Sequence, residues 1–506
     1  MPLPKAFAAR LLVALLLGAS SVLAYAPAGA FPLIWLTLGG LVALLTAECE
    51  DRRARNGALL GAAFGFGLFL GGVSWIYVSL SVFGGMPVPL AALATLIFCA
   101  GLSAYPALAG AAFVRFSPAA WWQRSLFFAA LWTLSEWLRG WAFTGFPWLA
   151  TGYSQTPPSP LAGFTPLLGV YGVSLLCALI AALSCEALQH NASSKRKRSM
   201  IIILLALLLG SGQLLRQQQW TTPLPAPLSV ALLQGNIAQD LKWRPEKFKE
   251  SLRTYYRLAH KTPAQLTVLP ETAIPAFLEQ VPGEYLDELE KLAKRQQGDL
   301  LFGTVFGDGA RYSNGAASLG QSPSQRYSKA HLVPFGEFIP PGFAWFLAMS
   351  NIPMSSFTRG EKDQPPLRIA GQKVAVNICY EDAFGEEIIR ALPEATLLVN
   401  LSNVAWFGDS LAPQQHLQIA RLRALETGRT MLRATNTGMT AIVAPDGAVL
   451  GALPPFTRGA LRGEAQGYTG ETPYVRWGDA PLLALAALIA TLVALAGNFG
   501  LRARRT

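Results

Sequence analysis

Long apolar runs constrain this chain more than any other feature of its sequence. A helix that crosses a membrane needs about 20 mostly apolar residues. Runs of this length lie at about 8–25, 28–47, 57–78, 88–114, 123–140, 161–187, 199–215 and 480–499. We therefore predict a polytopic α-helical membrane domain with about eight transmembrane helices, seven of them within residues 1–216. The first run could instead be a cleavable signal peptide, which would leave the rest of this topology unchanged.

The composition indicates a membrane protein with a soluble part. Hydrophobic residues make up 52% of the chain and charged residues only 14%, whereas soluble domains carry roughly 25% charged residues. Residues 217–480 hold 25 Lys and Arg against 25 Asp and Glu, so the net charge of +11 comes entirely from the remainder. A nucleic-acid-binding protein would carry such an excess on a folded basic face. Here the excess lies in short loops, so we expect no nucleic-acid partner.

Basic residues in the short loops indicate the orientation of the chain. Fourteen of them fall on one side of the predicted membrane domain, and only Arg139 falls on the other. Positive residues accumulate in cytoplasmic loops, so we expect both termini in the cytoplasm and residues 220–478 outside. Glu136 and Arg139 are rare ionisable residues within the runs, and we expect them to pair or to snorkel at an outer helix end. This rarity argues against an ion-coupled transporter.

Residues 220–478 alternate between strand-like and helix-like segments. The predicted strands are 228–234, 266–269, 300–305, 373–378, 396–401, 431–435 and 439–444, and the predicted helices are 246–261, 283–297 and 413–428. Such alternation favours a single α/β domain. Residues 480–506 would then form the eighth helix and a short basic cytoplasmic tail.

Three polar residues in this domain each follow an apolar strand or lie in a tight turn. They are Glu271 after LTVLP, Lys329 in RYSKAHLVPFGEF, and Cys379 after KVAVNI. Taken singly, they could be a helix cap, a solvated strand-edge lysine and a buried core thiol. Cys379 is the only cysteine of the neutral region, the chain has no CxxC, and its four histidines are scattered. We therefore expect no disulfide in this domain and no metal or other cofactor.

Together these stretches match a known pattern. LPET, SKAHLVPFGE and NICYE in an α/β domain resemble the nitrilase superfamily with its Glu–Lys–Cys triad. With seven apolar runs before this domain and one after it, the chain resembles the apolipoprotein N-acyltransferases of Gram-negative bacteria. The stretches QGNIAQDLKW, SNVAWFG and RATNTG extend the resemblance over essentially the whole chain. Val404 departs from the Asp that similar proteins often carry, which affects only local loop hydrogen bonding.

The resemblance implies an αββα sandwich and a set of roles. Glu271 would be the general base, Cys379 the nucleophile, and Lys329 an oxyanion stabiliser together with the backbone N–H of Tyr380. Glu337 would be a supporting carboxylate. Three further positions match residues that the family uses around its site, namely Trp243, Tyr380 and Glu381.

The resemblance also implies a reaction. An acyl chain would pass from a membrane phospholipid to Cys379 as a thioester, and then to the α-amine of a diacylglyceryl apolipoprotein at the periplasmic side of the inner membrane. We expect a monomer. The alternatives are a membrane-tethered amidase and, from another class, a transporter or a non-catalytic platform. The apolar stretch Phe343–Met354 could be a core segment or a lip that dips into the outer leaflet.

Overall fold

The computed structural model of the 506-residue chain describes residues 6–51, 53–188, 194–240, 242, 244–307, 311–343 and 356–502. The chain folds into two compact units. The helical unit comprises Met1–Ser74, Ala92–Gln218 and Trp477–Thr506, and the sandwich unit comprises Trp75–Ala91 and Gln219–Arg476.

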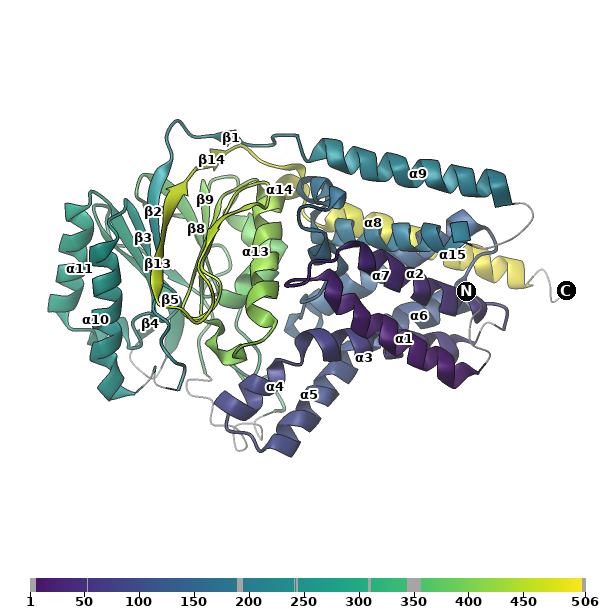
Figure 1. The fold of residues 1–506 in the computed structure, drawn as a ribbon, viewed down its shortest axis with the longest axis horizontal. Helices are drawn as coiled ribbons and strands as arrows, with labels where there is room; N and C mark the ends of the chain where they lie inside the picture. Colours follow the sequence, from purple (N-terminus) through teal and green to yellow (C-terminus); the bar gives the residue numbers. More distant parts are fainter. Residues whose placement is uncertain are drawn as a thin grey trace. The chain divides into compact units, whose positions relative to one another are not determined.

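The helical unit is built from long apolar helices (Figure 1). They are α1 (Phe7–Ser21), α2 (Pro32–Ala47), α3 (Ala54–Val73), α5 (Val88–Leu102), α6 (Ala104–Phe116), α7 (Trp121–Trp141), α8 (Thr165–Leu188), α9 (Ser194–Leu215) and α15 (Ala480–Arg502). Glycines allow close packing between helices: a Cβ on Gly61 of α3 would lie 2.2 Å from the carbonyl oxygen of Pro106 in α6. The predicted run at 88–114 is divided between α5 and α6 at Ser103.

Several of these segments are suited to a membrane by length and composition. Within the described ranges, five are long and apolar enough to cross one: Phe7–Ala24, Ala54–Val73, Val88–Phe116, Pro160–Leu188 and Lys195–Leu215. Two shorter apolar helices are Pro32–Ala47 and Ala480–Ala496. The predicted class, a helical membrane domain joined to an α/β domain, is confirmed, whereas the count of eight spans stays a prediction.

The expectation for Glu136 and Arg139 is wrong. Both side chains are buried in α7, at 4% and 3% exposed, so neither snorkels. Arg139 Nη1 donates to the carbonyl oxygen of Trp148 at 2.6 Å, and Glu136 Oε1 accepts from the Thr151 N–H at 2.8 Å. The two side chains therefore satisfy backbone groups of the irregular segment after α7 rather than each other.

Two six-stranded sheets form the middle of the sandwich unit (Figure 1). The first has the order β13-β2-β3-β4-β5-β6 and the second the order β12-β11-β10-β9-β8-β7. In each, three central strands are parallel (β2, β3 and β4; β8, β9 and β10) and the outer strands are antiparallel. The strands are β2 (Leu228–Gln234), β3 (Leu266–Val268), β4 (Asp299–Gly307), β5 (Tyr312–Gly320), β6 (Arg326–Ser328), β7 (Leu367–Ile369), β8 (Gln372–Ile378), β9 (Leu397–Ser402), β10 (Met431–Thr435), β11 (Ala441–Val443), β12 (Val449–Ala452) and β13 (Gly459–Ala465). A separate pair joins β1 (Thr222–Pro223) to β14 (Tyr468–Thr469).

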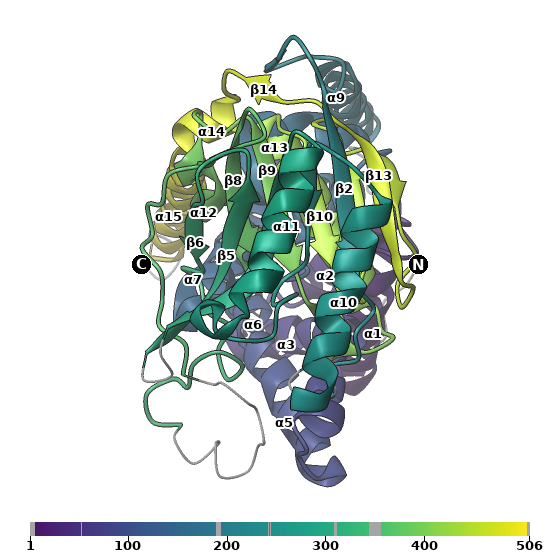
Figure 2. The ribbon, with the colours of Figure 1, turned by 90° about the vertical axis from the view of Figure 1, so that its left-hand side faces the viewer.

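Helices cover the outer face of each sheet, which gives the expected αββα sandwich. Figure 2 shows α10 (Pro245–Lys261) and α11 (Gly283–Arg295) in front of the first sheet, and α13 (Ala412–Thr427) lies on the second. Because the central strands are buried on both faces, they read as nearly continuous apolar runs. Val230, Val376 and Val399 belong to the core between the sheets, whereas Leu398 and Met431 pack in the core that contains residues of α13.

Of the antiparallel outer strands, only β11 corresponds to a predicted strand, at 439–444, and the others were missed. β5 has the sequence YSNGAASLG, whose Gly, Ser and Asn residues have low strand propensity. It is nevertheless paired with β4 over nine residues, from Tyr312 to Gly320. Small residues fit this position because the strand is largely buried, so tertiary context overrides propensity here. The short helices α12 (Gly385–Ile388) and α14 (Pro473–Trp477) complete this part of the chain.

The sandwich unit also contains a segment from the N-terminal half of the sequence. Residues Trp75–Ala91, with α4 (Ile76–Val78) and the π-helical turn η2 (Ser79–Phe83), belong to it. Ser79 Oγ donates to the carbonyl oxygen of Trp406 at 2.7 Å, and the Trp75 ring lies 4.4 Å from that of Phe407. This segment therefore packs on the turn η10 (Val404–Phe407).

Candidate active site

The residues of the expected triad lie at strand ends in the two sheets. Glu271 follows β3 by a short turn, Lys329 directly follows β6, and Cys379 follows β8 and opens the 3-10 turn η8 (Cys379–Ala383). β3 and β6 belong to the first sheet and β8 to the second. The ends of sheet strands are a common position for chemistry in α/β proteins because the following turns present their side chains together.

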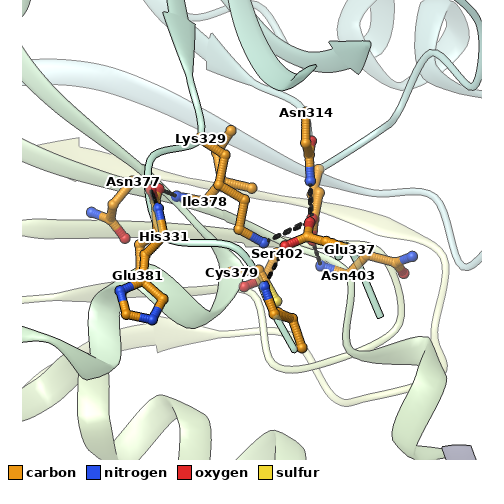
Figure 3. A network of polar contacts seen from close by, with 12 residues as sticks. Asn314, Lys329, His331, Glu337, Asn377, Ile378, Cys379, Glu381, Ser402 and Asn403 are labelled. Atoms are coloured by element: carbon orange, nitrogen blue, oxygen red, sulfur yellow. Dashed lines mark hydrogen bonds and ion pairs between the residues drawn. The ribbon is translucent and has the colours of Figure 1, made fainter. Parts of the chain in front are cut away.

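Lys329 lies between two carboxylates, one of which is Glu337 in Figure 3. Its Nζ is 2.8 Å from Glu337 Oε1 and 3.8 Å from Glu271 Oε1, and its side chain is only 1% exposed. Burial alone would lower the pKa of Lys329, but Glu337 and then Glu271 outweigh it, and the net shift is upward. Lys329 is therefore a permanent cation at neutral pH.

Further donors fix both carboxylates. Asn314 of β5 donates from Nδ2 to Glu271 Oε1 at 2.7 Å and to Glu337 Oε1 at 2.9 Å (Figure 3). The backbone N–H of Asn403 donates to Glu271 Oε2 at 2.8 Å, and that of Val333 to Glu337 Oε2 at 2.8 Å. The carboxylates are thus held by neutral donors as well as by the lysine. Glu271, Asn314, Lys329, Glu337 and Cys379 are called the triad cluster below.

Cys379 is held in an unusual backbone conformation. Its φ angle is +54°, in the left-handed region that residues other than glycine seldom adopt. Such a residue costs of the order of 1–3 kcal/mol and persists only where its surroundings hold it. Here the carbonyl oxygen of Cys379 accepts from Asn400 Nδ2 at 3.1 Å and contacts His416 Nε2 at 3.3 Å. These bonds fix the turn that presents the thiol.

A second polar cluster lies behind this turn. Strand register places Asn377, Asn400 and Arg433 side by side on β8, β9 and β10. Arg433 Nη1 contacts Asp382 Oδ2 at 3.0 Å and Asn400 Oδ1 at 2.7 Å, and His416 Nε2 contacts Asp382 Oδ1 at 2.7 Å. All five side chains are at most 3% exposed. Asn377, Asp382, Asn400, His416 and Arg433 are called the supporting cluster below.

Glu381 ties the lysine-bearing loop to the cysteine-bearing strand. Its Oε1 accepts from the N–H groups of Ala330 at 2.7 Å and His331 at 3.0 Å, and its Oε2 accepts from that of Ile378 at 2.6 Å. Tyr327 donates its hydroxyl to both oxygens. Burial raises the pKa of Glu381 to about 7, against the lowering effect of Lys329 and the three N–H donors. The groups that donate to Glu381 are three backbone N–H groups and one tyrosine hydroxyl. This set of partners suits a residue that joins two loops.

The electrostatics of Cys379 require a base. Burial and then Glu271 raise the pKa of the thiol to about 12, although Lys329 acts in the opposite direction. Because the thiolate is the nucleophilic form, a thiol with this pKa must lose its proton as it reacts. The Glu271 carboxylate is the neighbouring group that can accept it. Among the described residues, no three His, Cys, Asp or Glu side chains are grouped so that they could hold a metal ion.

The remaining predicted residues are placed as follows. Tyr380 is buried in η8, where its ring packs against Phe384 at 5.1 Å. Trp243 lies outside the described residues, as does Phe343–Met354 except for Phe343 itself, so the proposed lip stays a prediction.

Sequence reasoning missed several polar residues of the site. Asn314 is hidden in a stretch that reads as a turn, and Asn403 acts through its backbone, which no side-chain pattern reveals. Lys242 precedes Trp243 in the quoted stretch QDLKW, and its ammonium donates to the carbonyl oxygen of Glu271 at 3.1 Å. A lysine in a polar stretch normally indicates a solvated surface, yet Lys242 is 3% exposed.

Comparisons with known proteins agree with this geometry. Residues 17–183 match the family described as "Apolipoprotein N-acyltransferase N-terminal domain", and residues 229–474 match "Carbon-nitrogen hydrolase". The chain is 49% identical to an apolipoprotein N-acyltransferase of Nitrosomonas europaea over 97% of this chain and 98% of that protein. It belongs to the apolipoprotein N-acyltransferase family.

Other members of the apolipoprotein N-acyltransferase family are similar over nearly the full chain. A relative from Ralstonia nicotianae is 46% identical over 94% of this chain and 91% of its own length. Among solved structures, a CN-hydrolase superfamily protein of Xanthomonas campestris matches 47% of this chain and 91% of its own, with 16% identity and a TM-score of 0.38. The full-length relatives indicate that the protein is an N-acyltransferase with a membrane part, and the match of residues 229–474 to the carbon-nitrogen hydrolase family confirms the resemblance to the nitrilase superfamily.

Proposed function

We propose that this protein transfers a fatty acyl chain from a membrane phospholipid to the α-amino group of the N-terminal S-diacylglyceryl-cysteine of apolipoproteins. This transfer would complete the maturation of the lipoprotein. The observation that carries the proposal is the meeting of Glu271, Lys329 and Cys379 from separate strands, with Lys329 Nζ 3.8 Å from Glu271 Oε1. The names of the full-length relatives support the acceptor and the type of transfer.

In the first half-reaction, Cys379 attacks the carbonyl carbon of the acyl ester. The thiol proton passes to Glu271 as the S–C bond forms, and the carbonyl electron pair moves onto the oxygen. Lys329 and the backbone N–H of Tyr380 stabilise this oxyanion, and one such donor is typically worth about 10²–10³ in rate. Collapse of the intermediate breaks the ester C–O bond, and Glu271 returns the proton to the leaving lysophospholipid. Glu337 and Glu381 act by positioning, and we assign Trp243 to the same supporting set.

In the second half-reaction, the neutral α-amine of the acceptor attacks the thioester carbon. Glu271 takes a proton from the nitrogen, the C–S bond breaks, and the thiol is regenerated with that proton. These two half-reactions make up a ping-pong mechanism that uses no cofactor. We also propose that the protein acts as a monomer. Hydrolysis of a small amide is not favoured, because the relatives that match the whole chain are named as N-acyltransferases.

We also propose that the sandwich unit faces the periplasm and that both termini are cytoplasmic. The support is the distribution of basic residues in the short loops. A C-terminal fusion to a fluorescent protein that matures only in the cytoplasm should fluoresce, whereas a fusion to a phosphatase active only in the periplasm should be inactive. The reverse pattern would refute this orientation.

The acyl transfer is tested with a phospholipid that carries a tagged acyl chain. The wild-type protein should accumulate a hydroxylamine-labile label on the peptide that contains Cys379, read by mass spectrometry. Cys379→Ala should carry no such label, whereas Cys49→Ala, which removes a half-buried cysteine of the helical unit, should label like the wild type. Label that persists in Cys379→Ala would disprove the thioester. Addition of a diacylglyceryl peptide should then discharge the label into an amide.

A further inference from the structure

A second lysine lies at the reacting centre. Lys242 is 3% exposed, and the one hydrogen bond of its ammonium group within the described chain joins Nζ to the carbonyl oxygen of Glu271 at 3.1 Å. An ammonium group has three donors, so two N–H groups of Lys242 have no acceptor in the described part of the protein. The ammonium group is close enough to the Glu271 carboxylate and to Cys379 for both to raise the pKa of Lys242.

The loop that carries Lys242 is held by hydrogen bonds to the residues that precede it. The Ile237 N–H donates to Asn436 Oδ1 at 3.0 Å, and Asn436 Nδ2 donates back to the Ile237 carbonyl oxygen at 2.8 Å. Gln239 Oε1 then accepts from Asn403 Nδ2 at 2.8 Å. Asn403 is the residue whose N–H holds Glu271. The burial of Lys242 is therefore part of the same framework that positions the base.

In the resting site, the anion left to match this cation is the Glu271 carboxylate. Lys329 is paired with Glu337 at 2.8 Å, and Arg433 is paired with Asp382 at 3.0 Å. When Glu271 has taken the proton of the Cys379 thiol, the new negative charge appears on the attacked oxygen. Lys242 has then lost the negative charge of Glu271, so it can balance the oxyanion together with Lys329.

A purely structural role explains Lys242 poorly. Burial of an ammonium is costly unless the charge is paired, and a carbonyl oxygen can be satisfied by any neutral donor. We propose that Lys242 is a second cation that stabilises the anionic tetrahedral intermediates of acyl transfer, in addition to Lys329. This inference rests on the proposed function. Lys242 keeps all its protons in the step, so the proton still moves only between Cys379, Glu271 and the leaving group.

The structure also predicts how this role depends on pH. Burial lowers the pKa of Lys242 to about 8, although Glu271 and Cys379 act to raise it. The cation is therefore lost as the pH rises through about 8, and acyl-enzyme formation should slow over the same range. Lys329, the other lysine of the site, has its pKa shifted upward and stays charged there.

The test is the single-turnover rate of label transfer from the tagged phospholipid to Cys379. Lys242→Met removes the charge and should slow the transfer by about 10²-fold with little change in the half-saturating lipid concentration. Lys242→Arg keeps the charge at every accessible pH, and its rate should not fall between about pH 7 and pH 9. Lys247→Met, an exposed residue of the same stretch, should behave like the wild type.

The outcomes separate this inference from the proposed function. No label in the wild type would refute the function itself. If the wild type is labelled and Lys242→Met transfers the label at a rate within threefold of the wild-type rate, only the role of Lys242 is overturned. If Lys242→Met does not fold, as judged from its melting temperature, the Lys242→Arg profile decides: an alkaline fall that matches the wild type would overturn the proposal.

Discussion

The triad cluster and the supporting cluster both contain buried charged side chains, yet they use their hydrogen bonds differently. In the supporting cluster, Asn400 and His416 direct their bonds to a backbone carbonyl, that of Cys379 itself. In the triad cluster, backbone and amide donors instead hold the side chain of Glu271 in place. Burial of charge therefore does not by itself distinguish catalysis from structure. In these two clusters the bonds differ in direction: Asn400 and His416 fix the backbone of the turn at Cys379, whereas the Glu271 carboxylate is itself held in place.

The largest effect should come from the base of the triad cluster. Glu271→Gln keeps an oxygen for one of its two donors, Asn314 or Asn403, but removes the proton acceptor, so the acylation rate should fall by about 10²–10⁴-fold. The melting temperature should change little. Glu279→Gln, at an exposed position just downstream, is the matched control. A large loss of stability in Glu271→Gln would mean that this cluster is structural like the other one.

The supporting cluster should show the opposite pattern. Arg433→Met leaves the carboxylate of Asp382 buried without its cation, which typically costs about 3–5 kcal/mol of stability. Chemical unfolding of the detergent-solubilised protein should show this loss, whereas Arg462→Met at an exposed site should not. If Arg433→Met unfolds like the wild type but acylates slowly, the cluster acts on the chemistry directly.

Alkylation of Cys379 by iodoacetamide tests whether Cys379 is a thiolate at neutral pH before substrate binds. Since the pKa of the thiol is raised to about 12, its thiolate fraction should increase about tenfold per pH unit between about pH 7 and pH 9. The rate at this peptide should follow that increase without a plateau. A plateau near neutral pH would indicate a preformed ion pair with Lys329 and would remove the need for a base.

The smallest effect on the acylation rate should come from the side-chain amide of Asn314, which donates to both Glu271 and Glu337. Asn314→Ala removes two hydrogen bonds, but Glu271 keeps the N–H of Asn403 and Glu337 keeps Lys329. A loss of about 1–2 kcal/mol in transition-state stabilisation would slow acylation about 5–30-fold. Ser313→Ala on the adjacent residue is the control. A wild-type rate in Asn314→Ala would show that the lysine alone orders the carboxylates.

The sequence predicted the fold class and the parallel strands that carry the site, and it missed what depends on packing. β2, β8 and β9 are mostly runs of leucine, valine, isoleucine and alanine, so their pattern is local and visible. β5 is composed of small and polar residues whose strand conformation is imposed by β4. Burial of Lys242 likewise depends on contacts with Asn403 and Asn436 from far along the chain. Long-range contacts of this kind leave no mark in a single sequence.

One feature of the sandwich unit concerns the time at which it can finish folding. Trp75 Nε1 donates to Gln415 Oε1 at 3.2 Å, between residues that are 340 positions apart in the sequence. At about 5–20 residues per second, a ribosome needs roughly 17–68 s to add that length of chain. The residues on which Trp75 and its neighbours pack are therefore not yet synthesised for most of the time that the ribosome needs to make the chain. A hydrolase-like fragment that begins at Gln219 would contain all three triad residues but would never acquire the segment that packs on the turn beside Asn403.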